Sequence, residues 1–88
     1  MLQFKTLEKS ASVSINGEVV FLSASDIENI FWHTADLYDT EHTGSAAVTL
    51  GQKTFILPEV EWQALYAASV SYIQNELEFA ELMNIAKH

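Results

Sequence analysis

Beyond Pro58 the sequence runs on to residue 88 without glycine or proline, and this stretch constrains the fold more than any other feature. Proline suits the first turn of a helix, because its φ is fixed and it has no N–H to donate. After it, apolar residues recur at intervals of three and four in two neighbouring stripes. The first stripe is Trp62, Tyr66, Ser69, Val70, Ile73, Leu77 and Ala80, and the second is Leu65, Ala68, Tyr72, Phe79 and Met83. This spacing predicts one long helix over residues 59–86.

The apolar face of this predicted helix is wide, because its two stripes lie side by side. One face of a small sheet covers a narrower strip than that. We therefore expect the second stripe to be covered by the shorter helix predicted over residues 26–38, by a second copy of the chain, or by a partner protein.

Two β-hairpins are predicted in the first two thirds of the chain. Asn16-Gly17 separates two runs rich in β-branched residues, and both of its residues tolerate the positive φ of a type I′ turn. Gly51-Gln52 separates a second pair of such runs. The predicted strands cover residues 2–7, the segment around Val13 and Ile15, and residues 18–22, 47–50 and 54–57.

The shorter helix is predicted over residues 26–38. Ser25 and Glu28 fit a capping box, in which the serine hydroxyl accepts from the backbone N–H three residues on and the glutamate reaches back to the serine amide. The apolar residues of this segment fall on one face at helical spacing, with Leu37 beside them. They are Ile27, Ile30, Phe31, Thr34 and Tyr38. The polar residues 39–45 then predict a surface loop.

Together these elements predict an α+β fold: a small antiparallel sheet of two hairpins, with four to five strands, packs against a long C-terminal helix and a shorter middle helix. With 88 residues the chain is too short for two cores, so residues 1–88 are expected to form a single domain. The chain has no cysteine, which excludes disulfides and cysteine nucleophiles and favours the cytoplasm. No apolar run is long enough to span a bilayer, and the first residues lack the apolar core of a secretory signal.

The charge of the chain is strongly one-sided. Twelve Asp and Glu residues face four Lys and no Arg, which gives a net charge of −8 at pH 7. A protein that grips phosphates needs a basic surface, so neither direct nucleic-acid binding nor docking on an anionic membrane is expected. The charge serves either solubility or steering toward a basic partner, and both readings stay open.

The most informative surface candidate is Trp32. If the apolar face of the helix over 26–38 points to the core, Trp32 points away from it, and acidic residues stand beside it or in the loop that follows. The predicted partner-binding residues are Glu28, Trp32, Asp36, Asp39 and Glu41. No basic residue occurs between Lys9 and Lys53, so this surface suits a basic protein, with the tryptophan as its anchor. In the alternative, Trp32 folds back under the loop over 39–45 and joins the edge of the core.

These features predict a small acidic protein-binding module, an inhibitor or adaptor that docks on the basic surface of a nucleic-acid-binding protein. Small inhibitors encoded by phages, including anti-restriction and anti-CRISPR proteins, often have this size and acidity, and the chain is similar to them in type without sharing a motif. The alternative is a self-associating structural protein without a catalytic role, closed as a homodimer through the long helix.

Two other kinds of site have little support in the sequence. His33, Asp36, Asp39, Glu41 and His42 offer imidazole and carboxylate ligands, but their spacing matches no metal signature, so no metal or cofactor is expected. Nucleophilic catalysis would need a serine or threonine paired with a histidine, and no nucleophile-elbow motif surrounds any serine. The chain is therefore not expected to be an enzyme.

Overall fold

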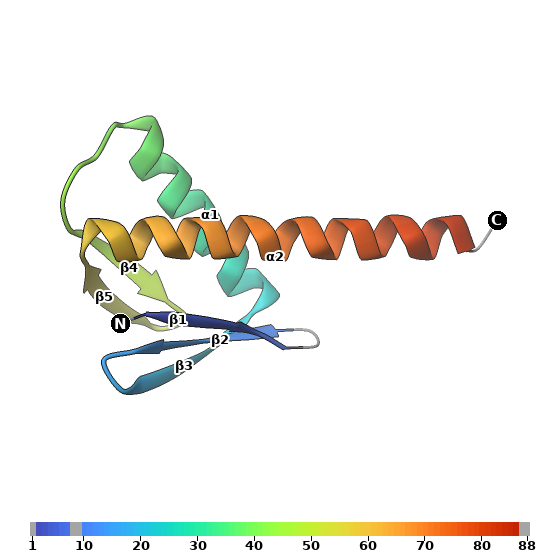
Figure 1. Ribbon diagram of the computed structural model, residues 1–88, viewed down its shortest axis with the longest axis horizontal. Helices are drawn as coiled ribbons and strands as arrows, with labels where there is room; N and C mark the ends of the chain where they lie inside the picture. Colours follow the sequence, from blue (N-terminus) through green and yellow to red (C-terminus); the bar gives the residue numbers. More distant parts are fainter. Residues whose placement is uncertain (1, 8–9, 87–88) are drawn as a thin grey trace.

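The chain has the predicted α+β fold, with the longer helix at its C-terminal end (Figure 1). The computed structural model describes residues 2–7 and 10–86, and their side chains as far as Glu76. In chain order the elements are β1 (Gln3–Thr6), β2 (Ser10–Ile15), β3 (Glu18–Ser23), α1 (Ala24–Asp39), β4 (Ala46–Leu50), β5 (Lys53–Leu57) and α2 (Glu59–Ala86). The described strands form two antiparallel sheets, β1-β2-β3 and β4-β5, rather than one sheet made from both hairpins.

The three-stranded sheet is shaped by the predicted turn at Asn16-Gly17. These two residues have φ angles of 52° and 82°, in the left-handed region that asparagine and glycine tolerate best. Ile15 therefore pairs with Glu18 directly across the turn. Side chains alternate along β2, with its serines on the outer face. Its buried residues are Ala11, Val13 and Ile15.

The second hairpin, β4–β5, is also confirmed, and it lies beside β3. Lys53, the first residue of β5, places its Nζ 2.8 Å from the carboxylate of Glu18, the first residue of β3. Both side chains are exposed, so this ion pair contributes little stability but marks how the hairpins meet. The inner faces of the two sheets share one hydrophobic core with both helices. The hairpin contributes Ala46, Val48, Leu50 and Leu57 to it.

The predicted capping box of α1 is wrong by two residues. The N-cap is Ser23, whose Oγ accepts from the amide of Asp26 at 3.2 Å, while the Asp26 carboxylate accepts from the Ser23 amide at 3.0 Å. The serine-to-acid spacing of three occurs twice in this segment, and Ser25 and Glu28 are the second pair. With the earlier pair in use, β3 leads into α1 without a loop, and Ser25 is the second residue of the helix.

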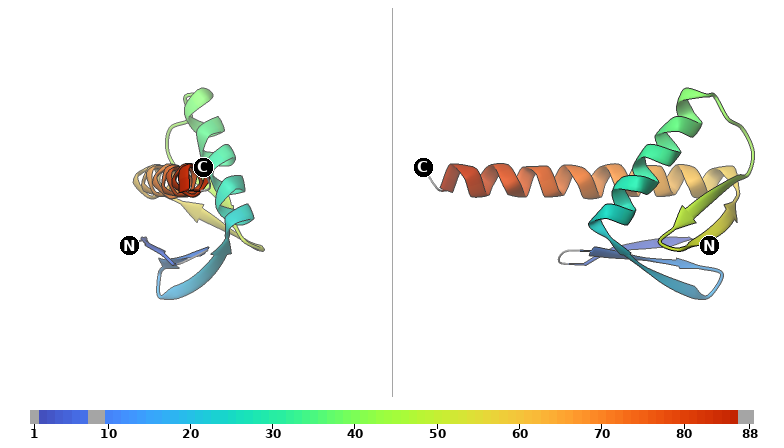
Figure 2. Two further views of the ribbon diagram at one scale, coloured as in Figure 1. Left: turned by 90° about the vertical axis from the view of Figure 1, so that its right-hand side faces the viewer. Right: turned by 180° about the vertical axis from the view of Figure 1, so that it is seen from behind.

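The two helices cross steeply (Figures 1 and 2). Aromatic side chains meet between them. Phe31 of α1 stacks on Tyr66 of α2 with ring centroids 5.9 Å apart. Tyr38 of α1 contacts Tyr66 at 4.7 Å and the edge of Trp62 at 5.2 Å. Such pairs add to the area that they bury. The shorter helix thus covers part of the wide apolar face of α2. These aromatic contacts fall on the first stripe of that face and not on the second stripe, where the sequence predicted them.

The predicted helix over 59–86 is confirmed, and it runs on beyond both sheets and α1 (Figure 1). Its 28 residues span about 42 Å at 1.5 Å per residue, close to the 48 Å length of the molecule. Trp62 anchors its first turns: the indole Nε1 donates to the carbonyl oxygen of Gly44 at 2.9 Å, and the ring is 1% exposed. The stripe members Leu77, Phe79, Ala80 and Met83 lie outside the described side chains.

Candidate functional site

The predicted partner-binding residues lie along the side of α1 that faces solvent. Glu28, Trp32 and Asp36 follow one another at intervals of four, so they share one face of the helix. Asp39 is the last helical residue, and Glu41 follows in the loop. All five of these residues are exposed, and we call them the acidic face: Glu28, Trp32, Asp36, Asp39 and Glu41.

Trp32 is exposed, and its predicted alternative position under the loop is wrong. Its side chain is 64% exposed, and its ring meets Phe31 edge-on at 5.2 Å. The loop over 40–45 lies instead by the first turns of α2, since Trp62 bonds to Gly44 and the His42 ring lies 6.2 Å from the Trp62 ring. The loop therefore leaves Trp32 uncovered.

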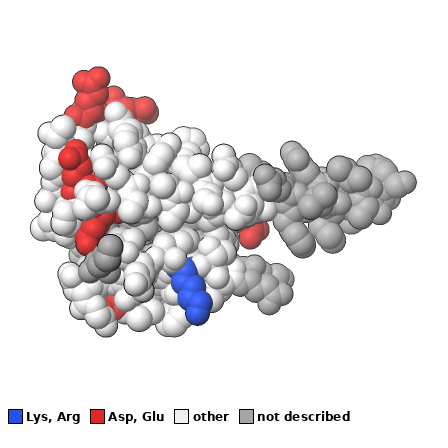
Figure 3. All heavy atoms as spheres, in the orientation of Figure 1, with Lys and Arg blue, Asp and Glu red and all other residues white. Residues whose placement is uncertain are grey.

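Acidic residues lie at the C-terminal end of α1, where the helix backbone already carries partial negative charge. The C-terminal end of a helix carries partial negative charge, which a basic side chain usually offsets. The last turn of α1 contains no basic residue, yet Asp36 and Asp39 stand there and Glu41 follows with φ of 54°. Figure 3 shows acidic side chains over this end of α1 and along the side where α2 begins. This arrangement weakens the helix slightly and strengthens the local negative potential.

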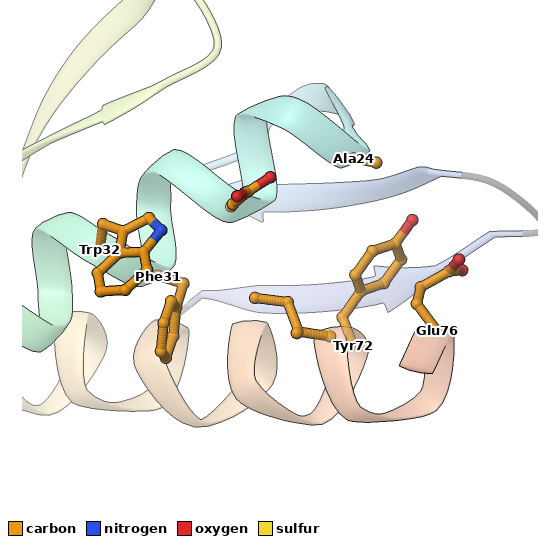
Figure 4. Close-up of a pocket in the computed structure, with 7 residues that line it drawn as sticks. Ala24, Phe31, Trp32, Tyr72 and Glu76 are labelled. Carbon is orange, nitrogen blue, oxygen red and sulfur yellow. The ribbon is translucent and has the colours of Figure 1, made fainter. Parts of the chain in front are cut away.

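A hollow of about 350 Å³ opens beside Trp32, between α1 and α2 (Figure 4). Its walls are mostly apolar, and its charged groups are both carboxylates. The lining residues are Ala24, Glu28, Phe31, Trp32, Tyr72, Ile73 and Glu76. Figure 4 shows Trp32 and Phe31 near one end, and Tyr72 and Glu76 near the other. The volume is at the small end of the range for ligand pockets.

Tyr72 brings a buried hydroxyl to the hollow. The residue is 3% exposed, and its buried Oη has no hydrogen-bond partner among the described residues. Burial raises the pKa of this phenol, and the negative charge of Glu76 raises it further. The hydroxyl is therefore neutral at physiological pH. A buried polar atom without a partner costs free energy, so it marks a place where a ligand group gains most by binding.

Sequence reasoning missed the α2 side of this hollow. It assigned Tyr72 to the core and gave Glu76 no role. The second apolar stripe passes through Leu65, Tyr72 and Phe79, and the next position on that side after Tyr72 is Glu76. An acidic residue that interrupts an apolar stripe is the signal that could have identified this site.

The structure does not bring the two candidate histidines of a metal site together. His33 lies in a small polar recess with Asp26 and Thr49, while the His42 Nε2 pairs with the Ser45 carbonyl at 2.9 Å. Within the described residues, no three His, Asp or Glu side chains are grouped closely enough to hold a metal ion. The alternative of a metal centre at these positions has no geometric support.

Other exposed apolar side chains occur on β3, β5 and α2, and they lack the setting of Trp32. Phe21 is 73% exposed and Ile56 78% exposed. Neither residue lines either of the two hollows described here, whereas Trp32 lines the larger one beside two carboxylates. Isolated exposed apolar residues are normal, but an exposed tryptophan beside a hollow is a candidate binding site.

The chain matches no protein family model, no curated protein and no solved structure. Among the described helices, none is long and apolar enough to cross a membrane. Function must therefore be inferred from the geometry and charge of the acidic face itself.

Proposed function

We propose that the chain is a small acidic protein-binding module that docks on the basic surface of a nucleic-acid-binding protein. It acts without catalysis, as an inhibitor or adaptor, in the manner of phage-encoded anti-defence inhibitors. The observation that carries the proposal is a tryptophan, 64% exposed, with Glu28 and Asp36 one turn away on either side.

Trp32 supplies the binding energy in this account. Covering the 64% of Trp32 that is exposed contributes about 3 kcal/mol, since a whole aromatic side chain buries about 150–250 Å² at about 25 cal/mol per Å². Tryptophan also dominates measured hot spots, because it is large and loses few rotamers on binding. Exposing it in the free protein is unfavourable, and a partner that covers it removes that cost.

The carboxylates supply steering and choice of partner. A net charge of −8 and an acidic face without basic residues attract a basic protein and repel nucleic acid. A DNA- or RNA-binding protein holds phosphates with lysine and arginine, and carboxylates at the spacing of helical turns address the same side chains. Binding of this kind would compete directly with the nucleic acid.

The experiment is capture of proteins on the immobilised chain from a lysate of its source cells. The expected result is a nucleic-acid-binding protein that added double-stranded DNA or RNA releases from the chain. Capture should be lost with Trp32→Ala, which removes the anchor, and with Asp36→Lys, which reverses a central charge.

Two matched variants keep this test specific. Phe21→Ala removes an exposed aromatic from β3, and Glu18→Lys makes the same change of two charges at the start of β3. Both should capture the partner as the parent chain does. Undiminished capture by Trp32→Ala and Asp36→Lys would exclude the acidic face as the docking surface, and capture that nucleic acid does not affect would exclude competition.

The second candidate function is self-association through α2. The observation that favours it is the length of α2, which continues past the sheets and α1 (Figure 1). Light scattering after size-exclusion chromatography decides between the two. A homodimer gives twice the 9.9 kDa mass of the chain, and a monomer at high micromolar concentration excludes this role as the main function.

A further inference from the structure

The hollow between α1 and α2 has the chemistry of a receptor for a cationic side chain. Its apolar walls include Phe31, Trp32 and Ile73, which suit the methylene stem of a long side chain. Its charged lining residues are Glu28 and Glu76, and no basic residue lines it in the part of the chain that the structure describes. A purely apolar guest would leave these carboxylates without partners, whereas a cationic guest would pair with them.

The two ends of the hollow differ, and this difference gives the guest a direction. Figure 4 shows Trp32 and Phe31 near one end and Tyr72 with Glu76 near the other. Glu28 lies between Ala24 and Trp32 along α1, so negative charge reaches the hollow from both helices. The stem of a guest side chain fits the aromatic end, and its charged head fits the acidic end.

Tyr72 supplies an independent indication that a polar group belongs at this acidic end. Its hydroxyl is buried and has no hydrogen-bond partner in the described part of the chain. As a neutral phenol, it offers an oxygen lone pair that can accept from an ammonium or guanidinium N–H. A guest group that donates hydrogen bonds and also carries positive charge can bond to this oxygen and pair with the two carboxylates.

We propose that the hollow receives one lysine or arginine side chain of the basic partner, with its stem against Phe31, Trp32 and Ile73 and its charged head between Glu28, Glu76 and Tyr72. This inference rests on the proposed function and specifies how the partner is recognised: the acidic face steers the partner, and the hollow selects one side chain. Glu28 and Trp32 belong to both, whereas Glu76 belongs to the hollow alone and Asp39 to the acidic face alone.

The probes are four capped pentapeptides, Gly-Gly-Xaa-Gly-Gly, in which Xaa is lysine, arginine, norleucine or glutamate. Norleucine has the stem of lysine without its charge. Each peptide is titrated against the full chain while the two tryptophan indole N–H signals are followed by NMR. The Trp32 signal should move and saturate with the lysine and arginine peptides and stay in place with the other two. The Trp62 signal is an internal control, because that indole is buried and bonded to Gly44.

Two variants that remove the same charge separate the hollow from the acidic face. Glu76→Gln should weaken binding of the lysine peptide about tenfold, because a hydrogen bond to a charged group is lost. Asp39→Asn should change it less than about twofold, since a rim charge acts mainly through screened attraction. Equal binding of the norleucine peptide, no saturable shift of the Trp32 signal, or equal effects of the two variants would each overturn the proposal.

The two proposals fail differently. A basic partner that depends on Trp32 and Asp36 but binds Glu76→Gln as well as the parent chain leaves the acidic face in place and excludes the hollow. Lysine peptides that bind the hollow, in a chain that captures no nucleic-acid-binding protein, exclude the proposed function and retain the cationic site.

Discussion

Trp62 belongs to the core and Trp32 to the surface, so the same substitution to phenylalanine should affect stability differently at the two positions. Trp62 is buried and donates to Gly44, so Trp62→Phe removes a hydrogen bond and leaves a gap in the core. We expect its free energy of unfolding to fall by about 1–3 kcal/mol. Trp32→Phe should change it by less than about 0.5 kcal/mol, because that ring is 64% exposed. Urea denaturation measures both, and equal losses would contradict these assignments.

Tyr72 makes the free energy of unfolding depend on pH in the alkaline range. Burial first and the charge of Glu76 second raise its pKa above 10.0 in the folded protein. A group with a raised pKa contributes stability that is present below its unfolded pKa and is lost as the pH rises through the folded value. The free energy of unfolding should therefore decline above about pH 10, and Tyr72→Phe should remove that part of the decline.

The same substitution should also stabilise the free protein at neutral pH. Tyr72→Phe deletes a buried hydroxyl that has no partner among the described residues, which is worth about 1 kcal/mol. Thermal unfolding at pH 7 and pH 11 (about one unit above the unfolded pKa) checks both effects, with Tyr38→Phe as an exposed control. A Tyr72→Phe chain that is less stable at pH 7 would show that the hydroxyl is paired, and one that keeps the full alkaline loss would show that Tyr72 is not the source of that loss.

At the scale of elements, the N-terminus of α1 tests the corrected capping box. Ser23 accepts from the Asp26 amide and caps the helix, whereas Ser25 lies inside the first turn. Ser23→Ala should therefore lower the free energy of unfolding by about 1 kcal/mol, and Ser25→Ala should leave it almost unchanged. Chemical denaturation measures both losses. A larger loss from Ser25→Ala than from Ser23→Ala would show that Ser25 is the N-cap, as the sequence predicted.

Local chemistry is what made the elements predictable from the sequence. The positive φ angles at Asn16 and Gly17 and the three-to-four spacing after Pro58 act within a few residues, so the first hairpin and α2 were correct. The start of α1 was wrong because two overlapping cap patterns satisfy the same local rule. Trp32 was correctly expected to point off the core face, since that follows from helical spacing alone.

Features that depend on how elements meet could not be read from the sequence. The division of the strands into two sheets depends on how the hairpins pack, to which no local signal points. The hollow forms only because α1 and α2 cross in a way that brings Glu28 and Glu76 to the same side. That crossing is set by aromatic packing such as Phe31 on Tyr66. Only the interruption of the apolar stripe at Glu76 hinted at it.

For the whole molecule, the distribution of charge predicts how binding responds to salt. If the acidic face steers a basic partner, raising the salt from about 50 mM to about 500 mM should slow association markedly, because screening shortens the reach of surface charge. Dissociation should change less, since Trp32 and the hollow hold the complex by contact. Stopped-flow or surface-binding kinetics separate the two rates, and a salt-independent association rate would contradict steering.

The central claim is that this chain binds a nucleic-acid-binding protein through the acidic face around Trp32. The measurement that tests it most directly is the Kd for the captured, purified partner, compared among Trp32→Ala, Asp36→Lys, Phe21→Ala and Glu18→Lys. We predict a loss of affinity of about tenfold or more for the first two and less than about twofold for the last two. Equal affinities for all four variants, or a larger loss from Phe21→Ala than from Trp32→Ala, would contradict the claim.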